Sequence, residues 1–331
     1  MSLSMRFAAL SASYSARRAQ KNSGSAGTVP HTNPEPPHTL RQHNAVSIRN
    51  IGEFQVYSVA PMAFADSTAN STQEQPDRRE SPQPSHVTNH LDELAPQQAA
   101  THACLYLHPG GFTNTIKPKS WHFIDHIAGA GIRVEIPIYG LLPTFTAAEA
   151  IPFIQDSYRE LVRDHGTENV SILADSAGGS LALGALTPIV DANPSSLILN
   201  APWVDMDLAN PAIPDIEQRD PVLNAAALRR AGALWSASIE GGTSSPVVSP
   251  IEMASSTLET WCGTTVRMYC GDRDLSLPDA RAMTSTLRSA GVDAELKVVP
   301  GGIHMYHLAK TAEGRRDRAE MIELMTGKDQ R

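Results

Sequence analysis

A serine at a sharp turn is the most chemically suggestive residue of this 331-residue sequence. The run Ala-Asp-Ser-Ala-Gly-Gly at 174–179 follows one short apolar stretch and opens another. That pattern predicts a nucleophile elbow, a tight strand-to-helix turn that exposes a serine Oγ above a sheet. Ser176 would then lie at a helix N-terminus, where free N–H groups favour developing negative charge. The alternative is an ordinary serine N-cap followed by a glycine turn.

A glycine turn precedes this serine in the chain. The run His-Pro-Gly-Gly at 108–111 directly follows the apolar residues 103–107. Gly110 and Gly111 can direct two backbone N–H groups at one point, as the binding of an oxyanion requires. An ordinary Pro-Gly turn would have the same composition. The position of this turn, after a buried strand and ahead of the serine, favours an oxyanion hole.

An acid and a base follow the serine, in the order that serine hydrolases on open α/β sheets use. Asp274 comes just after the apolar residues 265–269, and His304 just after residues 294–299. Both would therefore lie at the carboxyl ends of strands, where such sheets gather their sites. Asp272 and His307 are close enough in the sequence to compete for the same roles. Each of these side chains could also be a loop or surface residue.

Strand-like and helix-like segments alternate around these residues. The apolar pattern predicts strands at 56–60, 103–107, 132–137, 170–173, 196–199, 265–269 and 294–299. It predicts helices at 120–130, 147–165, 178–189, 279–290 and 315–325. This alternation indicates an α/β fold with a mostly parallel central sheet and helices on both faces. A helix-rich segment at about 206–245 would form a small helical cap.

Two segments have a composition that predicts disorder. Residues 1–44 are dominated by Ser, Ala, Gly, Pro and Asn, and residues 65–100 contain no aromatic side chain. Structureless loops above about 15 residues are unusual inside a compact domain, so the second segment is interpreted as a disordered insertion. One catalytic domain at 45–328 then replaces the two domains that about 150 residues per domain would suggest. We expect a cytoplasmic protein, although the acid-poor N-terminus also permits an organellar transit peptide.

Composition and charge exclude several classes of function. The chain has 27 Lys and Arg against 35 Asp and Glu, a net charge of −8, so nothing attracts it generally to nucleic acid. No apolar run approaches the roughly 20 residues that span a bilayer. Three cysteines are too few for a disulfide framework, and their spacing offers no zinc site. We expect no metal and no organic cofactor, and either a monomer or a homodimer.

The chain resembles the hormone-sensitive-lipase-like esterases, the bacterial family IV group of the α/β-hydrolase fold. The two glycine-rich runs are similar to that group's His-Gly-Gly-Gly and Gly-Asp-Ser-Ala-Gly-Gly motifs, and the similarity continues at 137–143, 201–205 and 219–223. Pro109 and Ala174 replace the first glycine of each motif. The group's oxyanion donors correspond to Gly110 and Gly111, so the oxyanion hole should survive the proline.

The resemblance implies a serine carboxylesterase with an α/β-hydrolase fold. Ser176 would be its nucleophile, His304 its general base and Asp274 the acid that orients the imidazole. The substrates would be short-chain acyl esters, from acetyl to butyryl, of small or medium hydrophobic alcohols. A lactonase, an amidase or a natural-product deacetylase would use the same triad. A homologue that binds a ligand without catalysis is a more distant alternative, because fold alone does not fix function.

Five neighbouring residues would support the reaction. The backbone N–H groups of Gly110, Gly111 and Ala177 are expected to form the oxyanion hole. His108 is expected to shape the oxyanion loop, and Asp175 to brace the elbow, without reacting themselves.

Overall fold

The computed structural model describes residues 2, 4–6, 8–9, 11–12, 35–62, 100–189 and 194–327. The predicted insertion at 65–100 therefore lies outside the described residues, apart from Ala100. The same holds for residues 13–34 of the predicted tail.

An eight-stranded sheet forms the centre of the protein, with the strand order β1-β2-β4-β3-β5-β6-β7-β8. The second strand runs antiparallel to both of its neighbours, and every other pairing is parallel. The prediction of a mostly parallel sheet is therefore confirmed. The strands are β1 Asn44–Ile51, β2 Phe54–Pro61, β3 His102–Leu107, β4 Ile132–Ile138, β5 Val170–Asp175, β6 Ser196–Asn200, β7 Thr265–Gly271 and β8 Ala294–Val299.

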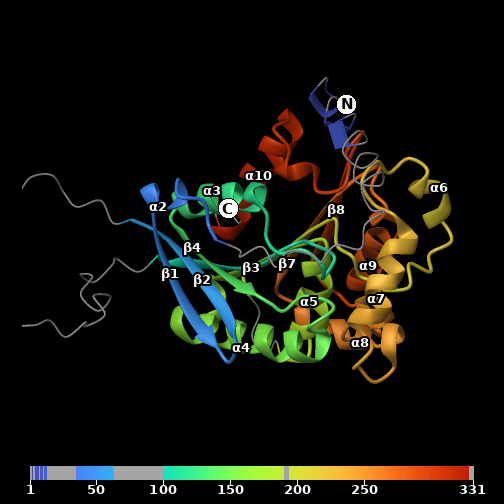
Figure 1. Cartoon of the computed structure of the whole chain (residues 1–331), viewed down its shortest axis with the longest axis horizontal. Helices are drawn as coiled ribbons and strands as arrows, with labels where there is room; N and C mark the ends of the chain where they lie inside the picture. Colours follow the sequence, from blue (N-terminus) through green and yellow to red (C-terminus); the bar gives the residue numbers. More distant parts are fainter. Residues whose placement is uncertain are drawn as a thin grey trace, which may run out of the picture.

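Helices bury both faces of this sheet (Figure 1). In β3, Leu105 and Leu107 pack into the apolar cluster on one face, whereas Cys104 and Tyr106 pack into the cluster on the other. This explains the continuous apolar run at 103–107, which is typical of a parallel strand covered on both sides. The helices on the first face are α4 Ala147–His165, α5 Ala177–Leu186 and α9 Leu277–Ser289, and those on the second are α3 Pro118–Gly129 and α10 Ala312–Met325.

Helix α4 has clear signals at both ends. Thr146 and Glu149 form a capping box, in which each side chain accepts a hydrogen bond from the backbone N–H of the other residue. Gly166, with φ 76°, follows the last residue, a conformation that favours glycine. The prediction of a helix at 147–165 is confirmed. Its bounds could be predicted because both end signals are local in the sequence.

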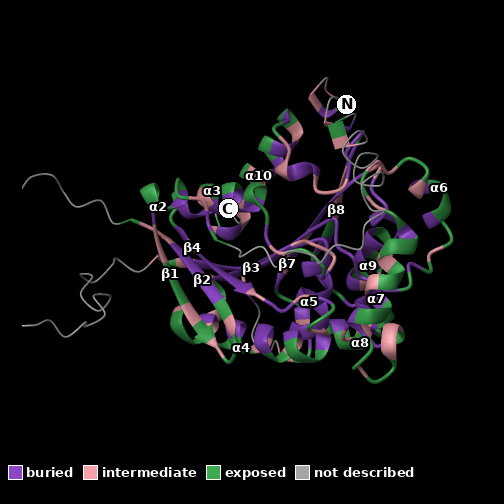
Figure 2. Ribbon diagram, viewed as in Figure 1, coloured by how far each residue is buried: buried purple, intermediate pink, exposed green. Residues whose placement is uncertain are grey.

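Two helices between β6 and β7 lie over the carboxyl end of the sheet: α6 Ile213–Glu217 and α7 Ala225–Trp235. The ring of Trp235, at the end of α7, stacks on Phe112 with 4.1 Å between centroids. Phe112 directly follows the glycine turn, so this stacking joins the helical segment to the predicted oxyanion loop. The outer side of α7 is largely exposed (Figure 2). The short helix α8 Ser255–Leu258 then leads towards β7.

The N-terminal region differs from the predicted disordered tail at 1–44. Residues 4–6, 8–9 and 11–12 are helical, and Met5 and Ala9 are buried in the cluster that contains α3 and α10. The backbone N–H and the hydroxyl of Ser2 both donate to the Glu313 carboxylate, at 3.0 and 2.7 Å. At the other end, helix α2 Leu40–His43 buries Leu40 before β1 begins. The tail prediction was wrong here because average composition hides a few well-placed apolar side chains.

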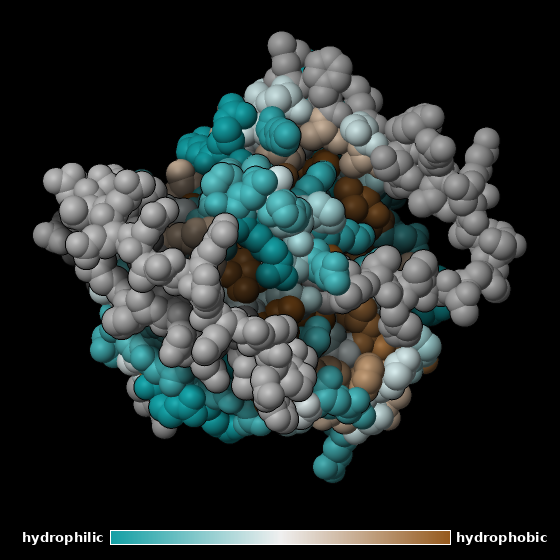
Figure 3. Space-filling model, turned by 60° about the vertical axis from the view of Figure 1, so that its left-hand side comes forward, coloured by the Kyte–Doolittle hydropathy of each residue, from teal (hydrophilic) through white to brown (hydrophobic). Residues whose placement is uncertain are grey.

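The surface of the described part is mostly hydrophilic on the face shown in Figure 3, where hydrophobic side chains appear in the hollows. Among the described residues, no helix combines the length and the apolar character that a membrane crossing requires.

Candidate active site

The predicted elbow joins β5 to α5, with Ser176 between them. Ser176 has φ 54°, a strained left-handed conformation for a residue with a side chain, of the kind found at functional turns. Its N–H donates to Asn200 O and its carbonyl accepts from Trp203 N, both at 2.9 Å. A side chain at Gly178 would overlap the carbonyl oxygen of Leu107. Glycine at this position therefore allows the elbow to pack tightly against β3.

Three side chains from three separate loops meet at the elbow. The Oγ of Ser176 lies 3.0 Å from Nε2 of His304. The Nδ1 of the same imidazole lies 3.1 Å from each carboxylate oxygen of Asp274. Asp274 is fully buried and also accepts hydrogen bonds from the N–H and the hydroxyl of Ser276, at 3.0 and 2.7 Å. This arrangement allows a proton to pass from the serine to an imidazole that a carboxylate orients.

The two competing residues lie elsewhere. His307 is buried on the face that carries α3, with Nε2 3.4 Å from Asp175, and its ring contacts Phe123. The carboxylate of Asp272 accepts from the N–H of Gly301 at 2.7 Å and so braces the loop that follows β8. Neither side chain approaches the serine.

Opposing effects set the charge of the central imidazole. Burial lowers the pKa of His304, but three carboxylates together raise it more: Asp274 by its negative charge and hydrogen bonding, and then Asp220 and Asp175 by their charges. The pKa of His304 is therefore above its ordinary value. This imidazole can accept a proton readily because three carboxylates stabilise its charged form.

The glycine turn lies beside the elbow. Gly110 and Gly111 have φ 143° and 60°, and a side chain on Gly110 would overlap the backbone of Asn114. Within the described part of the chain, the backbone N–H groups of Gly110, Gly111 and Ala177 have no backbone acceptor outside regular helices and strands. These N–H groups are thus available to a ligand, as an oxyanion hole requires.

His108 supports this turn from below. Its ring stacks on Tyr139 at 4.1 Å, its Nδ1 lies 2.8 Å from Pro109 O, and the Tyr139 hydroxyl donates to its carbonyl at 2.7 Å. Burial lowers the pKa of His108 to about 4, so this imidazole stays neutral near pH 7. Such a residue positions the loop and is unsuited to proton transfer near neutrality.

Asp175 is held within the sheet. Its carboxylate accepts hydrogen bonds from Tyr106 Oη at 2.6 Å and from Asn200 Nδ2 at 2.8 Å, and it is fully buried. These contacts tie β5 to its two neighbours just below Ser176. The geometry fits the predicted bracing of the elbow.

A small cavity lies between the serine and the helical segment 206–245. Its volume is about 10 Å³, close to the space that a single water molecule needs. It is lined mainly by apolar side chains of that segment and by the elbow's neighbours: Ser176, Pro202, Trp203, Leu208, Leu223, Leu228, Leu275, Ser276, Asp279 and His304. A group bound here against the serine would have little room.

Two carboxylates near the site, Asp279 and Asp220, were not predicted from the sequence. Asp279 lines the cavity, and its buried Oδ2 has no hydrogen-bond partner. Burial, followed by the charge of Asp205, raises the pKa of Asp279 to about 7. Asp220 accepts from Leu275 N at 2.7 Å, next to Asp274. The sequence signal for Asp220 was its place in the run 219–223, but no local pattern reveals that contact.

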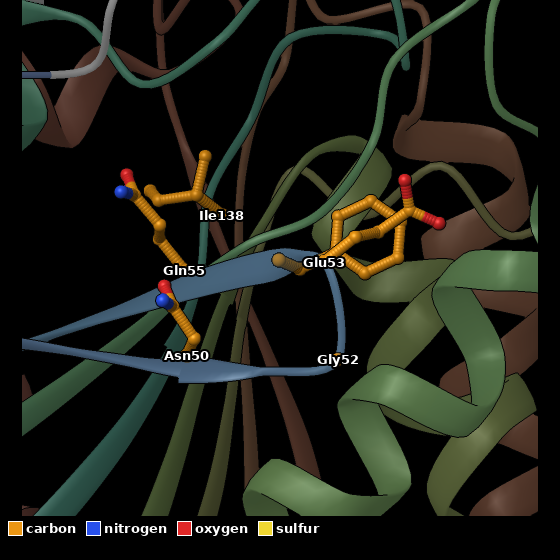
Figure 4. Close-up of a pocket in the computed structure, with 6 residues that line it drawn as sticks. Asn50, Gly52, Glu53, Gln55 and Ile138 are labelled. Carbon is orange, nitrogen blue, oxygen red and sulfur yellow. The ribbon is translucent and has the colours of Figure 1, made fainter.

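Another hollow lies at the β1–β2 turn, away from the elbow (Figure 4). Its lining residues are Asn50, Gly52, Glu53, Phe54, Gln55 and Ile138. These residues include no nucleophile paired with a base. Within the described residues, no group of three or more His, Cys, Asp or Glu side chains could hold a metal ion.

Comparison with known proteins identifies the family. The alpha/beta hydrolase fold family matches residues 104–308, more than half of the chain. The chain belongs to this family. The matched segment begins in β3 and includes the glycine turn, the elbow, Asp274 and His304. The predicted family and fold are thereby confirmed.

Several relatives of this α/β hydrolase have been named or solved. A triacylglycerol lipase of Mycobacterium tuberculosis is 31% identical over 34% of this chain and 27% of its own length. Esterase LipU of the same organism is 26% identical over 65% of this chain and 74% of its own. A bacterial hormone-sensitive lipase family esterase shares 20% identity, with a TM-score of 0.70 and 98% of each chain covered. The chain spans only about a quarter of the length of the first of these relatives.

Proposed function

We propose that this α/β hydrolase is a serine carboxylesterase that hydrolyses short-chain acyl esters of small or medium alcohols through an acyl-enzyme. The observation that carries the proposal is the unbroken chain of contacts from Ser176 Oγ through His304 to Asp274. The names of the relatives, which include esterases and a lipase, support the same class of reaction.

The reaction would proceed in two halves. Ser176 Oγ attacks the ester carbonyl while Nε2 of His304 takes its proton, and Asp274 stabilises the imidazolium. The N–H groups of Gly110 and Gly111, with that of Ala177, hold the negative oxygen of the tetrahedral intermediate. The intermediate collapses as His304 protonates the leaving alcohol. Water then attacks the acyl-enzyme by the same route and releases the acid and the free serine.

The small cavity beside the serine predicts a preference for short acyl chains. We expect kcat/KM for p-nitrophenyl acetate or butyrate to exceed that for the dodecanoate by roughly 10²-fold or more, because methylenes that do not fit weaken transition-state binding. Leu228→Ala should raise the relative rate on longer chains, since Leu228 lines the cavity. A series of esters from two to sixteen carbons measures both effects.

Leu234→Ala is the matched control for this series. Leu234 lies on the same helix α7, but it is 56% exposed and does not line the cavity. Its replacement should leave the chain-length profile unchanged. A profile that rises steadily towards sixteen carbons in the wild-type protein would contradict the short-chain assignment.

The raised pKa of His304 predicts the pH dependence of the reaction. The imidazole must be neutral to accept the serine proton, so kcat/KM should rise with pH through the pKa of His304. Because the surrounding carboxylates favour the charged form, the midpoint should lie above the ordinary value of about 6.5. Asp274→Asn should move the midpoint down and lower the rate. A profile that is flat from about pH 5 to 8 would exclude a histidine base.

A further inference from the structure

His304 also lines a larger cavity. Its volume is about 960 Å³, and its walls come from the N-terminal helical residues, the start of α3, the loop between β8 and α10, α10 itself, and Val222. The described residues that line it include Ala8 and Ser11 from the N-terminus, and His304 and Met305 from the loop. The small cavity and the large one therefore share His304, and only the small one includes Ser176.

The position of this cavity assigns it to one part of the substrate. In the proposed reaction, His304 protonates the alcohol as it leaves. The alcohol must therefore lie on the side of the imidazole, whereas the acyl group lies against Ser176. The position of Ser176 therefore assigns the acyl group to the side of the small cavity, and the alcohol to the large one.

The charges in the large cavity all have one sign. Its described lining holds four basic side chains, Lys117, Lys119, Lys310 and Arg318, and no aspartate or glutamate. None of the four forms an ion pair with a described carboxylate. This is contrary to the composition of the chain, in which acidic residues outnumber basic ones. A cavity of one sign raises the local concentration of ligands of the opposite charge.

Local structure strengthens this positive character. Lys117 is the N-cap residue of α3 and Pro118 occupies its first turn, so the positive end of the 12-residue helix dipole lies among these lysines. The Arg318 guanidinium donates to the carbonyl oxygens of His307 and Ala309, which fixes it at the cavity wall. These groups supply several donors for an anion in one region.

Much of the rest of the lining is apolar. Phe123, Ile303 and Leu308 face the same space, together with the ring of Tyr306. A ligand with an apolar body and a negatively charged end would contact both kinds of surface. A purely hydrophobic alcohol would leave the basic groups without a partner.

We propose that the preferred substrates are short-chain esters whose alcohol part has an apolar body and carries an anionic group, a carboxylate or a phosphate, bound by Lys117, Lys119, Lys310 and Arg318. This inference rests on the proposed esterase function. It adds an anionic group to the hydrophobic alcohol that the family resemblance implies.

Paired aryl acetates test the proposal. 4-Acetoxybenzoate is compared with its neutral methyl ester, and 4-acetoxyphenyl phosphate with neutral 4-methoxyphenyl acetate, each rate being divided by that of alkaline hydrolysis. We expect kcat/KM to be about tenfold or more higher for at least one anionic ester than for its neutral partner. The pair with the larger ratio distinguishes carboxylate from phosphate. The ratio should fall as ionic strength rises to roughly 0.5 M.

Charge variants test whether the preference for anionic esters comes from the cavity or from the general charge of the protein. The triple change Lys117→Gln, Lys119→Gln and Lys310→Gln should reduce the anionic-to-neutral ratio to about twofold or less. Using the ratio cancels any general loss of activity. Arg163→Gln removes one positive charge from α4, on the opposite face of the sheet, and should leave the ratio unchanged.

Each outcome has a distinct meaning. Equal or faster hydrolysis of both neutral esters, or a ratio that the triple variant leaves intact, would overturn the anionic-alcohol proposal while the esterase function stands. Absence of hydrolysis of every ester by folded protein would overturn the esterase function itself.

Discussion

Ser176→Ala should reduce kcat for p-nitrophenyl butyrate by about 10⁴-fold or more, because it removes the hydroxyl that contacts His304 and would form the acyl-enzyme. The change removes only a hydroxyl, and the backbone bonds that hold the elbow at Asn200 and Trp203 remain. The variant should therefore fold like the wild-type protein. A fluorophosphonate probe should label the wild type covalently and leave Ser176→Ala unlabelled.

Ser171→Ala is the matched control. Ser171 is a buried serine on β5, the strand that leads to the elbow, and its hydroxyl bonds to Ser195 and Ser196 far from His304. This variant should keep its activity and its labelling. Near wild-type hydrolysis by Ser176→Ala would refute the assignment of the nucleophile.

Gly178→Ala should strongly destabilise the fold beside the site. The new Cβ would overlap the backbone carbonyl of Leu107, which belongs to the core strand β3 and cannot turn aside as a flexible side chain would. Separating β3 from the elbow should lower the free energy of unfolding by about 3 kcal/mol. It should also reduce activity strongly, because Ser176 and the glycine turn would move apart. Chemical denaturation and ester hydrolysis measure the two effects.

Gly129→Ala makes the same chemical change where there is space. Gly129 is the last residue of α3, and a Cβ there would meet no atom within 4 Å. Alanine favours helix over glycine, so this control should be neutral or stabilise the protein by up to about 1 kcal/mol. If the two alanine variants unfold at the same denaturant concentration, the close approach at Leu107 does not limit the elbow.

Much of the fold follows from patterns that are local in the sequence. The strand at 103–107 is readable because burial on both faces demands an unbroken apolar run. The α4 boundaries are readable because the capping box at Thr146 and the glycine at 166 are contiguous with the helix. The N-terminal helical residues were missed because Met5 and Ala9 are buried in a cluster that includes side chains of α3 and α10, more than 100 residues away.

The candidate site also contains residues that local patterns predict and residues that they do not. The order of the serine, aspartate and histidine motifs predicted Ser176, Asp274 and His304 from the sequence alone. The choice between His304 and His307, three residues apart, depended on the turn between them. Met305 adopts φ 59° there, and the His304 imidazole contacts Ser176 whereas the His307 imidazole lies beside Asp175. The contact of Asp220 with Leu275 and the position of Asp279 in the cavity wall depend on tertiary packing, which no local pattern encodes.

The contacts of Asp220 connect the helical segment 206–245 to the catalytic acid. The carboxylate of Asp220 accepts from the N–H groups of Val222 and Leu223 on one side and of Leu275 on the other. The segment and the loop of Asp274 therefore share one hydrogen-bonded junction. Thermodynamic linkage requires that a ligand which holds the segment in place also protects that loop, and that disturbing the loop weakens the ligand by the same factor. The same coupling free energy would therefore appear in substrate affinity and in the stability of the Asp274 loop.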